Sequence, residues 1–129
     1  MNTPTIETQR LILRRFTQDD ARALYQILSD EEVNTFLPMF PLKTMEEANA
    51  YIQKQYLDTY QEPFGYRYAV CLKTDHIPIG YVQVSSSESH DFGYGLRKDF
   101  WHKGIITEAG RAVVEELRNS GMPFHHRNP

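Results

Sequence analysis

Alternation of apolar and polar residues marks short stretches of the chain that we expect to be β-strands. Side chains of a strand point to opposite faces in turn, so the pattern has a period of two. The clearest case is the run YRYAVCL at residues 66–72. Strand-like runs also predict strands at residues 10–16, 77–85 and 90–97.

Apolar residues spaced by three and four positions predict three amphipathic helices. The first is expected to begin after Thr17, with Asp20 in the place of a capping-box acid, and the second after the capping box Thr44–Glu47. The third is expected to follow the loop at residues 103–108 and to end near Gly121. The expected buried positions are Ala21, Leu24, Ile27 and Leu28; Ala48, Ile52, Tyr56 and Tyr60; and Ile106, Ala109, Val113 and Leu117.

The order of these elements is strand, two helices, three strands and a helix. Consecutive strands joined by short loops are expected to be antiparallel neighbours. We therefore predict an α+β fold whose sheet is mixed, mainly antiparallel, and flanked by helices.

Composition narrows the class of protein. A chain of 129 residues suits one domain with one core, so we expect residues 1–129 to form a single domain. The net charge of −3 argues against a general nucleic-acid binder, and no apolar run approaches the length of a membrane span. The one cysteine, Cys71, lies in an apolar run and is interpreted as a buried core residue; a chain without an intramolecular disulfide fits the reducing cytoplasm.

Gly104 lies where a loop turns into the third expected helix. Backbone N–H groups at a helix start point outward at the positive end of the helix dipole, and this arrangement binds anions such as phosphate. On spacing alone, a glycine there is more often a matter of chain geometry than of phosphate binding.

The run FWHKGIITEA at residues 100–109 resembles the acetyl-CoA-binding motif of the GNAT acyltransferases, in the subgroup that acetylates the N-termini of ribosomal proteins. It departs from that motif at Ile106, where a small residue is usual. The run ETQRLILR at residues 7–14 is similar to the first strand of the same subgroup. The resemblance implies a GNAT fold and acetyl-CoA as co-substrate.

By this resemblance, the fourth strand and the following loop would hold the coenzyme. The residues so implied are Tyr94, Gly95, Leu96, Arg97, His102, Lys103, Gly104, Ile105, Ile106 and Thr107. Gly93 and Gly95 also fit a strand that a ligand approaches closely, or else a β-bulge without a ligand. Asp91 is the candidate general base for an amine, and a solvated surface carboxylate is the alternative. Glu108 is expected to serve the helix dipole and packing instead.

The resemblance also implies that the C-terminal part of the GNAT fold is missing after the third helix. Either the chain is truncated, or a partner, for example a second copy, completes the sheet at residues 90–97. The expected function is acetyl transfer to a primary amine, of a small molecule or a protein N-terminus, with no nucleic-acid or membrane partner. The alternative is a non-catalytic GNAT-like binding or interaction module.

Overall fold

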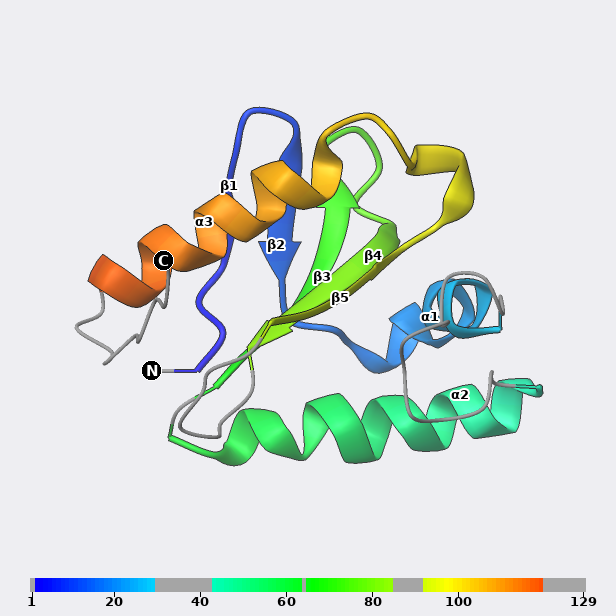
Figure 1. Cartoon of the computed structure of the whole chain (residues 1–129). Coiled ribbons are helices and arrows are strands. Elements are labelled where there is room, and N and C mark those ends of the chain that lie inside the picture. The colour runs from blue at the N-terminus through cyan, green and yellow to red at the C-terminus, as the bar shows by residue number, and fades with distance from the viewer. Residues whose placement is uncertain (1, 30–42, 64, 85–91, 120–129) are drawn as a thin grey trace.

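The computed structural model describes residues 2–29, 43–63, 65–84 and 92–119. Within these residues, five strands form one sheet in chain order, and every neighbouring pair is antiparallel (Figure 1). A parallel pairing occurs at the isolated bridge between Asn2 and Gly65. The strands are β1 (Ile6–Glu7), β2 (Leu11–Arg14), β3 (Tyr66–Leu72), β4 (Pro78–Val84) and β5 (Phe92–Leu96).

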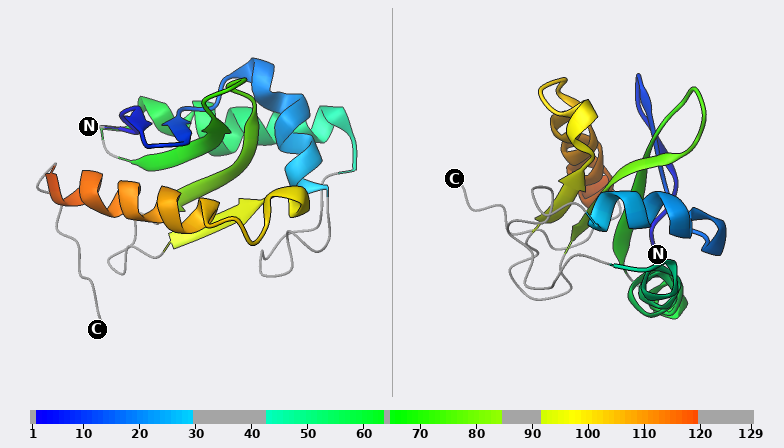
Figure 2. Two further views of the ribbon diagram at one scale, coloured as in Figure 1. Left: turned by 90° about the horizontal axis from the view of Figure 1, so that it is seen from above. Right: turned by 90° about the vertical axis from the view of Figure 1, so that its right-hand side faces the viewer.

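In the described ranges, three α-helices flank the sheet: α1 (Ala21–Leu28), α2 (Met45–Ile52) and α3 (Ile105–Asn119). Helix α3 covers one face, and α1 and α2 lie on the other side (Figures 1 and 2). The predicted α+β class is therefore confirmed. No helix in the described ranges is long and apolar enough to cross a membrane.

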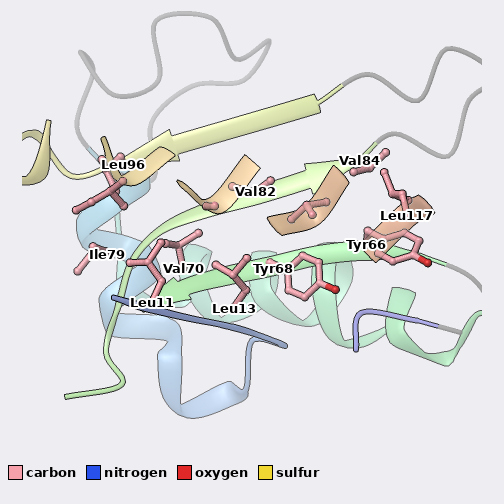
Figure 3. Packing of buried hydrophobic residues seen from close by; sticks show 13 residues of the cluster. Leu11, Leu13, Tyr66, Tyr68, Val70, Ile79, Val82, Val84, Leu96 and Leu117 are labelled. Carbon is pink, nitrogen blue, oxygen red and sulfur yellow. The ribbon is translucent and has the colours of Figure 1, made fainter. Parts of the chain in front are cut away.

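The core under α3 combines side chains from β2, β3, β4 and β5 with the buried stripe of the helix (Figure 3). The expected stripe needs one correction, because its first residue is Ile105, which is 3% exposed, and not Ile106. Ile105, Ala109, Val113 and Leu117 repeat every four residues, and Ile106 is turned about 100° from Ile105 around the helix axis. Ile106 is half-buried at the margin of this core.

A second core lies between the sheet and the pair α1 and α2. It contains Phe16, Cys71 and Tyr81 together with most of the expected residues of both helices; Tyr60 is partly buried against this core, and Ala21 is buried without belonging to it. The second helix departs from regular α geometry after Ile52, because a π-helical turn follows at Gln53–Leu57 and a 3-10 turn at Thr59–Gln61. Cys71 is buried, as expected for a core thiol, and burial raises its pKa to about 11.

Both predicted helix starts are stabilised by side chains. Thr44 Oγ1 accepts a hydrogen bond from the Glu47 N–H at 3.1 Å, while the Glu47 carboxylate accepts from the Lys43 N–H at 2.6 Å. Before α1, Asp20 accepts from the Thr17 N–H at 2.7 Å, and a 3-10 turn at Gln18–Asp20 precedes the α-helix.

Candidate active site

The connection from β5 to α3 is fixed to the sheet by two hydrogen bonds. The Arg97 N–H donates to the Ile79 carbonyl at 2.9 Å, so the chain stays aligned with β4 just beyond the end of β5. The indole N–H of Trp101 then donates back to the Leu96 carbonyl at 2.7 Å. The loop that leads into α3 is therefore held directly beside the end of β5.

Gly104 sets the geometry of the start of α3. Its φ of +74° is in the left-handed region, where glycine is favoured. A Cβ there would meet only Arg10 Nη2, at 3.7 Å, so the backbone conformation and not crowding calls for glycine. The Glu108 N–H donates to the Gly104 carbonyl at 3.0 Å and makes the first helical hydrogen bond.

Three backbone amides, those of Ile105, Ile106 and Thr107, precede that first helical hydrogen bond. Their N–H groups lie at the positive end of a 15-residue helix, which is the arrangement that favours an anion. Gly104 and Thr107 are exposed, whereas the Ile105 side chain belongs to the core. Ile105 can therefore offer only its backbone to a ligand.

Two cations of the loop before α3 lie near one aromatic ring. The Arg97 guanidinium is 5.6 Å from the centre of the Phe100 ring, and Lys103 Nζ is 5.8 Å from it. Asp99 pairs with Arg97 at 2.9 Å and offsets part of this charge. His102 is exposed and has a φ of +65°, so the loop carries a second left-handed residue two positions before Gly104.

Glu108 ties the start of α3 to the β1–β2 turn. Its carboxylate accepts from the Thr8 hydroxyl at 2.5 Å, from the Arg10 N–H at 3.0 Å and from Arg10 Nε at 2.7 Å. Arg10 Nη1 also donates to the Lys103 carbonyl at 3.0 Å. Partial burial acts to raise the pKa of Glu108, but these hydrogen bonds and the Arg10 charge outweigh it, and the pKa is lowered.

This bracing matches the packing role expected for Glu108. The sequence reasoning missed its partners Thr8 and Arg10, which are 100 and 98 residues away along the chain. No local pattern could have paired them. Both partners do lie within the N-terminal run that resembles the family, which was the available signal.

The described side chains of β5 are those of Tyr94 and Leu96, and the strand also contains two glycines. Tyr94 is 60% exposed, and Leu96 is buried in the core under α3. The pairing with β4 runs without a register shift from Phe92 to Leu96, so the described strand has no bulge there. The bulge interpretation of Gly93 and Gly95 is therefore wrong.

A side chain from β4 explains why position 95 is glycine, and another lies close to Gly93. A Cβ on Gly95 would lie 2.8 Å from Tyr81 Cζ, and one on Gly93 would lie 3.3 Å from Gln83 Cγ. The candidate base Asp91 lies outside the described residues, so its predicted role stays a prediction. The ten candidate coenzyme residues all lie in the described part, along β5, the loop and the first turn of α3.

A sheet strand that runs into a loop with two cations and then into the N-terminus of a helix is an arrangement that can bind an anion such as a phosphate group. The sequence matches the acetyltransferase (GNAT) domain over residues 10–125, and the chain belongs to this family. The family consists of acetyltransferases, so the chain is an enzyme of the acetyltransferase class. A comparison with curated protein sequences gives no significant match.

Solved structures with the same fold support the assignment. An acetyltransferase from Salmonella typhimurium that modifies the N-terminal serine of ribosomal protein L7/L12 is 18% identical, with a TM-score of 0.74 over 92% of this chain and 70% of its own. A putative ribosomal-protein-serine acetyltransferase from Vibrio cholerae is 23% identical, with a TM-score of 0.75 over 93% and 71%.

A third similar structure contains bound acetyl-CoA. The microcin C7 self-immunity acetyltransferase MccE, in complex with acetyl-CoA and AMP, is 21% identical and has a TM-score of 0.71 over 89% of this chain and 66% of that one. The present chain therefore spans about two thirds of the length of these proteins. At these identities the likeness concerns the fold.

Proposed function

We propose that the chain is an acetyl-CoA-dependent N-acetyltransferase that moves an acetyl group directly to a primary amine. The observation that carries the proposal is the junction of β5 and α3, where Gly104 opens a helix whose first N–H groups face outward. A diphosphate carries the charge that these groups favour. Family membership and the acetyl-CoA complex of MccE support acetyl-CoA as the co-substrate.

In this proposal the coenzyme follows the chain from the helix back to the strand. The backbone of Gly104 to Thr107 holds the diphosphate, and Lys103 and His102 add positive charge or hydrogen-bond donors beside it. The pantetheine arm then lies along β5, where the backbone of Tyr94 to Arg97 orients it. The charged side chains of Arg97 and Lys103 both lie near the Phe100 ring in the loop before the helix, which supports a role in attracting the diphosphate.

Acetyl transfer to an amine requires the loss of a proton before attack, because a primary amine with a pKa of about 10 is mostly protonated near neutral pH. We propose that Asp91, one residue before β5, removes this proton through water. The acceptor is a small-molecule amine or a protein N-terminus. The ribosomal-protein acetyltransferases among the similar structures make a protein N-terminus one acceptor to test.

The site of action is proposed to be the cytoplasm, in keeping with a buried free thiol at Cys71. That residues 1–129 act as one domain, and that a second copy completes the sheet, stay predictions.

The test is a thiol-release assay with acetyl-CoA and a panel of amines, run beside calorimetric titration of acetyl-CoA. The panel contains a peptide with a free N-terminal serine, the same peptide blocked at its N-terminus, a polyamine and an amino sugar. Binding together with thiol release that needs a free amine is the expected result. Absence of binding at millimolar acetyl-CoA would leave the non-catalytic interaction module as the function.

A further inference from the structure

The face of β5 that looks toward α1 and α2 has no side chains of its own at Gly93 and Gly95. Tyr81 and Gln83 of β4 are the register partners of Gly95 and Gly93, and their side chains extend over these glycines. The phenol end of Tyr81 lies above Gly95, because the Cβ position of Gly95 is 2.8 Å from Cζ and 3.0 Å from the hydroxyl oxygen. The Tyr81 hydroxyl is thus placed directly on the strand that the proposed function assigns to the coenzyme.

This hydroxyl is buried without a partner. Tyr81 is 3% exposed, and its hydroxyl is the buried side-chain polar atom that lacks a hydrogen bond within the part of the chain the structure describes. Other tyrosine hydroxyls of the sheet region are satisfied: Tyr68 donates to the Pro4 carbonyl and Tyr60 to the Arg67 carbonyl, both at 2.7 Å. An unpaired buried hydroxyl is costly for stability and calls for an explanation.

We propose that the Tyr81 hydroxyl donates a hydrogen bond to the carbonyl oxygen of the acyl thioester when the acyl group is bound beside Gly95. The inference rests on the proposed function, which places the diphosphate at the start of α3 and the thioester arm along β5. An acyl group on that path passes Gly95, over which the unpaired Tyr81 hydroxyl is held. Since the hydroxyl is closed off from water, the acyl group has to open the space beside Gly95 as it binds.

The chemistry of this donor suits a carbonyl on which negative charge develops. A donor held in place in a dry site stabilises such an oxygen more than a donor in water does. Burial raises the pKa of Tyr81, with a smaller contribution from Tyr51, so the phenol stays protonated at neutral pH. The hydroxyl keeps its proton throughout, and no proton transfer is assigned to it.

Tyr81→Phe tests this role, because it removes one oxygen and leaves the ring over Gly95. Since the hydroxyl has no partner in the described residues, the variant is expected to unfold at the same or a higher denaturant concentration than the unmodified chain. Acetyl transfer under saturating acetyl-CoA is expected to fall at least tenfold. The affinity for acetyl-CoA is expected to drop about two- to tenfold relative to that for coenzyme A, which has no acyl carbonyl.

The matched control is Tyr68→Phe, on β3 and in the other core. It loses a hydrogen bond to Pro4, so its denaturation midpoint is expected to fall while its transfer rate stays unchanged. Unchanged transfer and unchanged ligand preference in Tyr81→Phe would overturn the assignment and leave the proposed function intact. A Tyr81→Phe chain that fails to fold would also overturn it, by showing a structural partner. If the unmodified chain binds neither ligand, the proposed function itself fails.

Discussion

Replacement of Glu108 by glutamine tests how much the hydrogen bonds of its carboxylate, at the start of α3, contribute to the stability of the fold. The carboxylate of Glu108 accepts three hydrogen bonds, two of them from Arg10 and one from Thr8. Glutamine keeps the length and shape of the side chain but loses the charge and one acceptor oxygen. The variant therefore removes the ionic part of the contact between α3 and the β1–β2 turn without opening a cavity.

The expected loss of stability is modest. Hydrogen bonds to a charged group contribute about 1.5–3 kcal/mol each when buried. Here the Glu108 side chain is 20% exposed and that of Arg10 is 44% exposed, so solvent screens the pair. Glutamine loses the charge and the bond from Arg10 Nε to Oε1, whereas its amide oxygen in the place of Oε2 keeps the bonds from Thr8 and from the Arg10 N–H. We expect Glu108→Gln to lower the free energy of unfolding by about 1.5 kcal/mol at pH 7.

The lowered pKa of Glu108 determines how this loss of unfolding free energy changes with pH. The pKa of Glu108 is lower in the folded chain than in the unfolded chain, so its contribution is complete above the unfolded value of about 4.3 and is lost as the pH falls through the folded value. The difference between the variant and the unmodified chain should therefore shrink as the pH falls below about 4.

Urea denaturation between pH 3.5 and pH 7 measures this difference. Glu115→Gln is the control, because Glu115 is an exposed residue of the same helix, and we expect no change from it at either pH. Equal stabilities of Glu108→Gln and the unmodified chain at pH 7 would refute the bracing role.

Three further predictions concern other positions. Gly95→Ala places a methyl group 2.8 Å from Tyr81 Cζ, so it should lower both the stability and the rate of acetyl transfer. Its control is Gly110→Ala, where the space around the Cβ is open and neither quantity should fall. Denaturation measures the stability, and thiol release measures the transfer rate. Asp91→Asn should reduce turnover more than it changes acetyl-CoA affinity, and equal activity would remove Asp91 from the mechanism. Leu117→Ala, at a fully buried position under α3, should cost about 2–5 kcal/mol in the unfolding free energy, and a loss below 1 kcal/mol would contradict its place in the core.

Local patterns predicted the elements well because each is encoded by neighbouring residues. The apolar stripe of α2 and the capping box at Thr44 both lie within a few positions of the helix start, and both are present. The first turn of α3 was harder, since Ile105 and Ile106 are adjacent and equally apolar. Only the position of Gly104 and the direction of the incoming chain decide which of the two faces the sheet.

Contacts between distant residues could not be predicted from such patterns. The Glu108 brace joins residues about 100 positions apart, and the overlap of Tyr81 with Gly95 depends on the register of β4 against β5. The glycines of β5 were predicted to mark either the close approach of a ligand, which stays a prediction, or a bulge, which the described pairing contradicts. Their neighbour turned out to be a side chain from β4, which a single-sequence pattern does not specify.

The central claim is that the first N–H groups of α3 bind the diphosphate of acetyl-CoA, and calorimetric titration of Gly104→Asp tests it most directly. Aspartate is strained at the φ of +74°, although less than most residues with a side chain, and it would place a carboxylate beside the bound diphosphate. Gly110→Asp introduces the same charge further along the same helix, at a position with open space. The account predicts a dissociation constant at least tenfold higher for Gly104→Asp and an unchanged one for Gly110→Asp. Equal affinity of Gly104→Asp and the unmodified chain would contradict it.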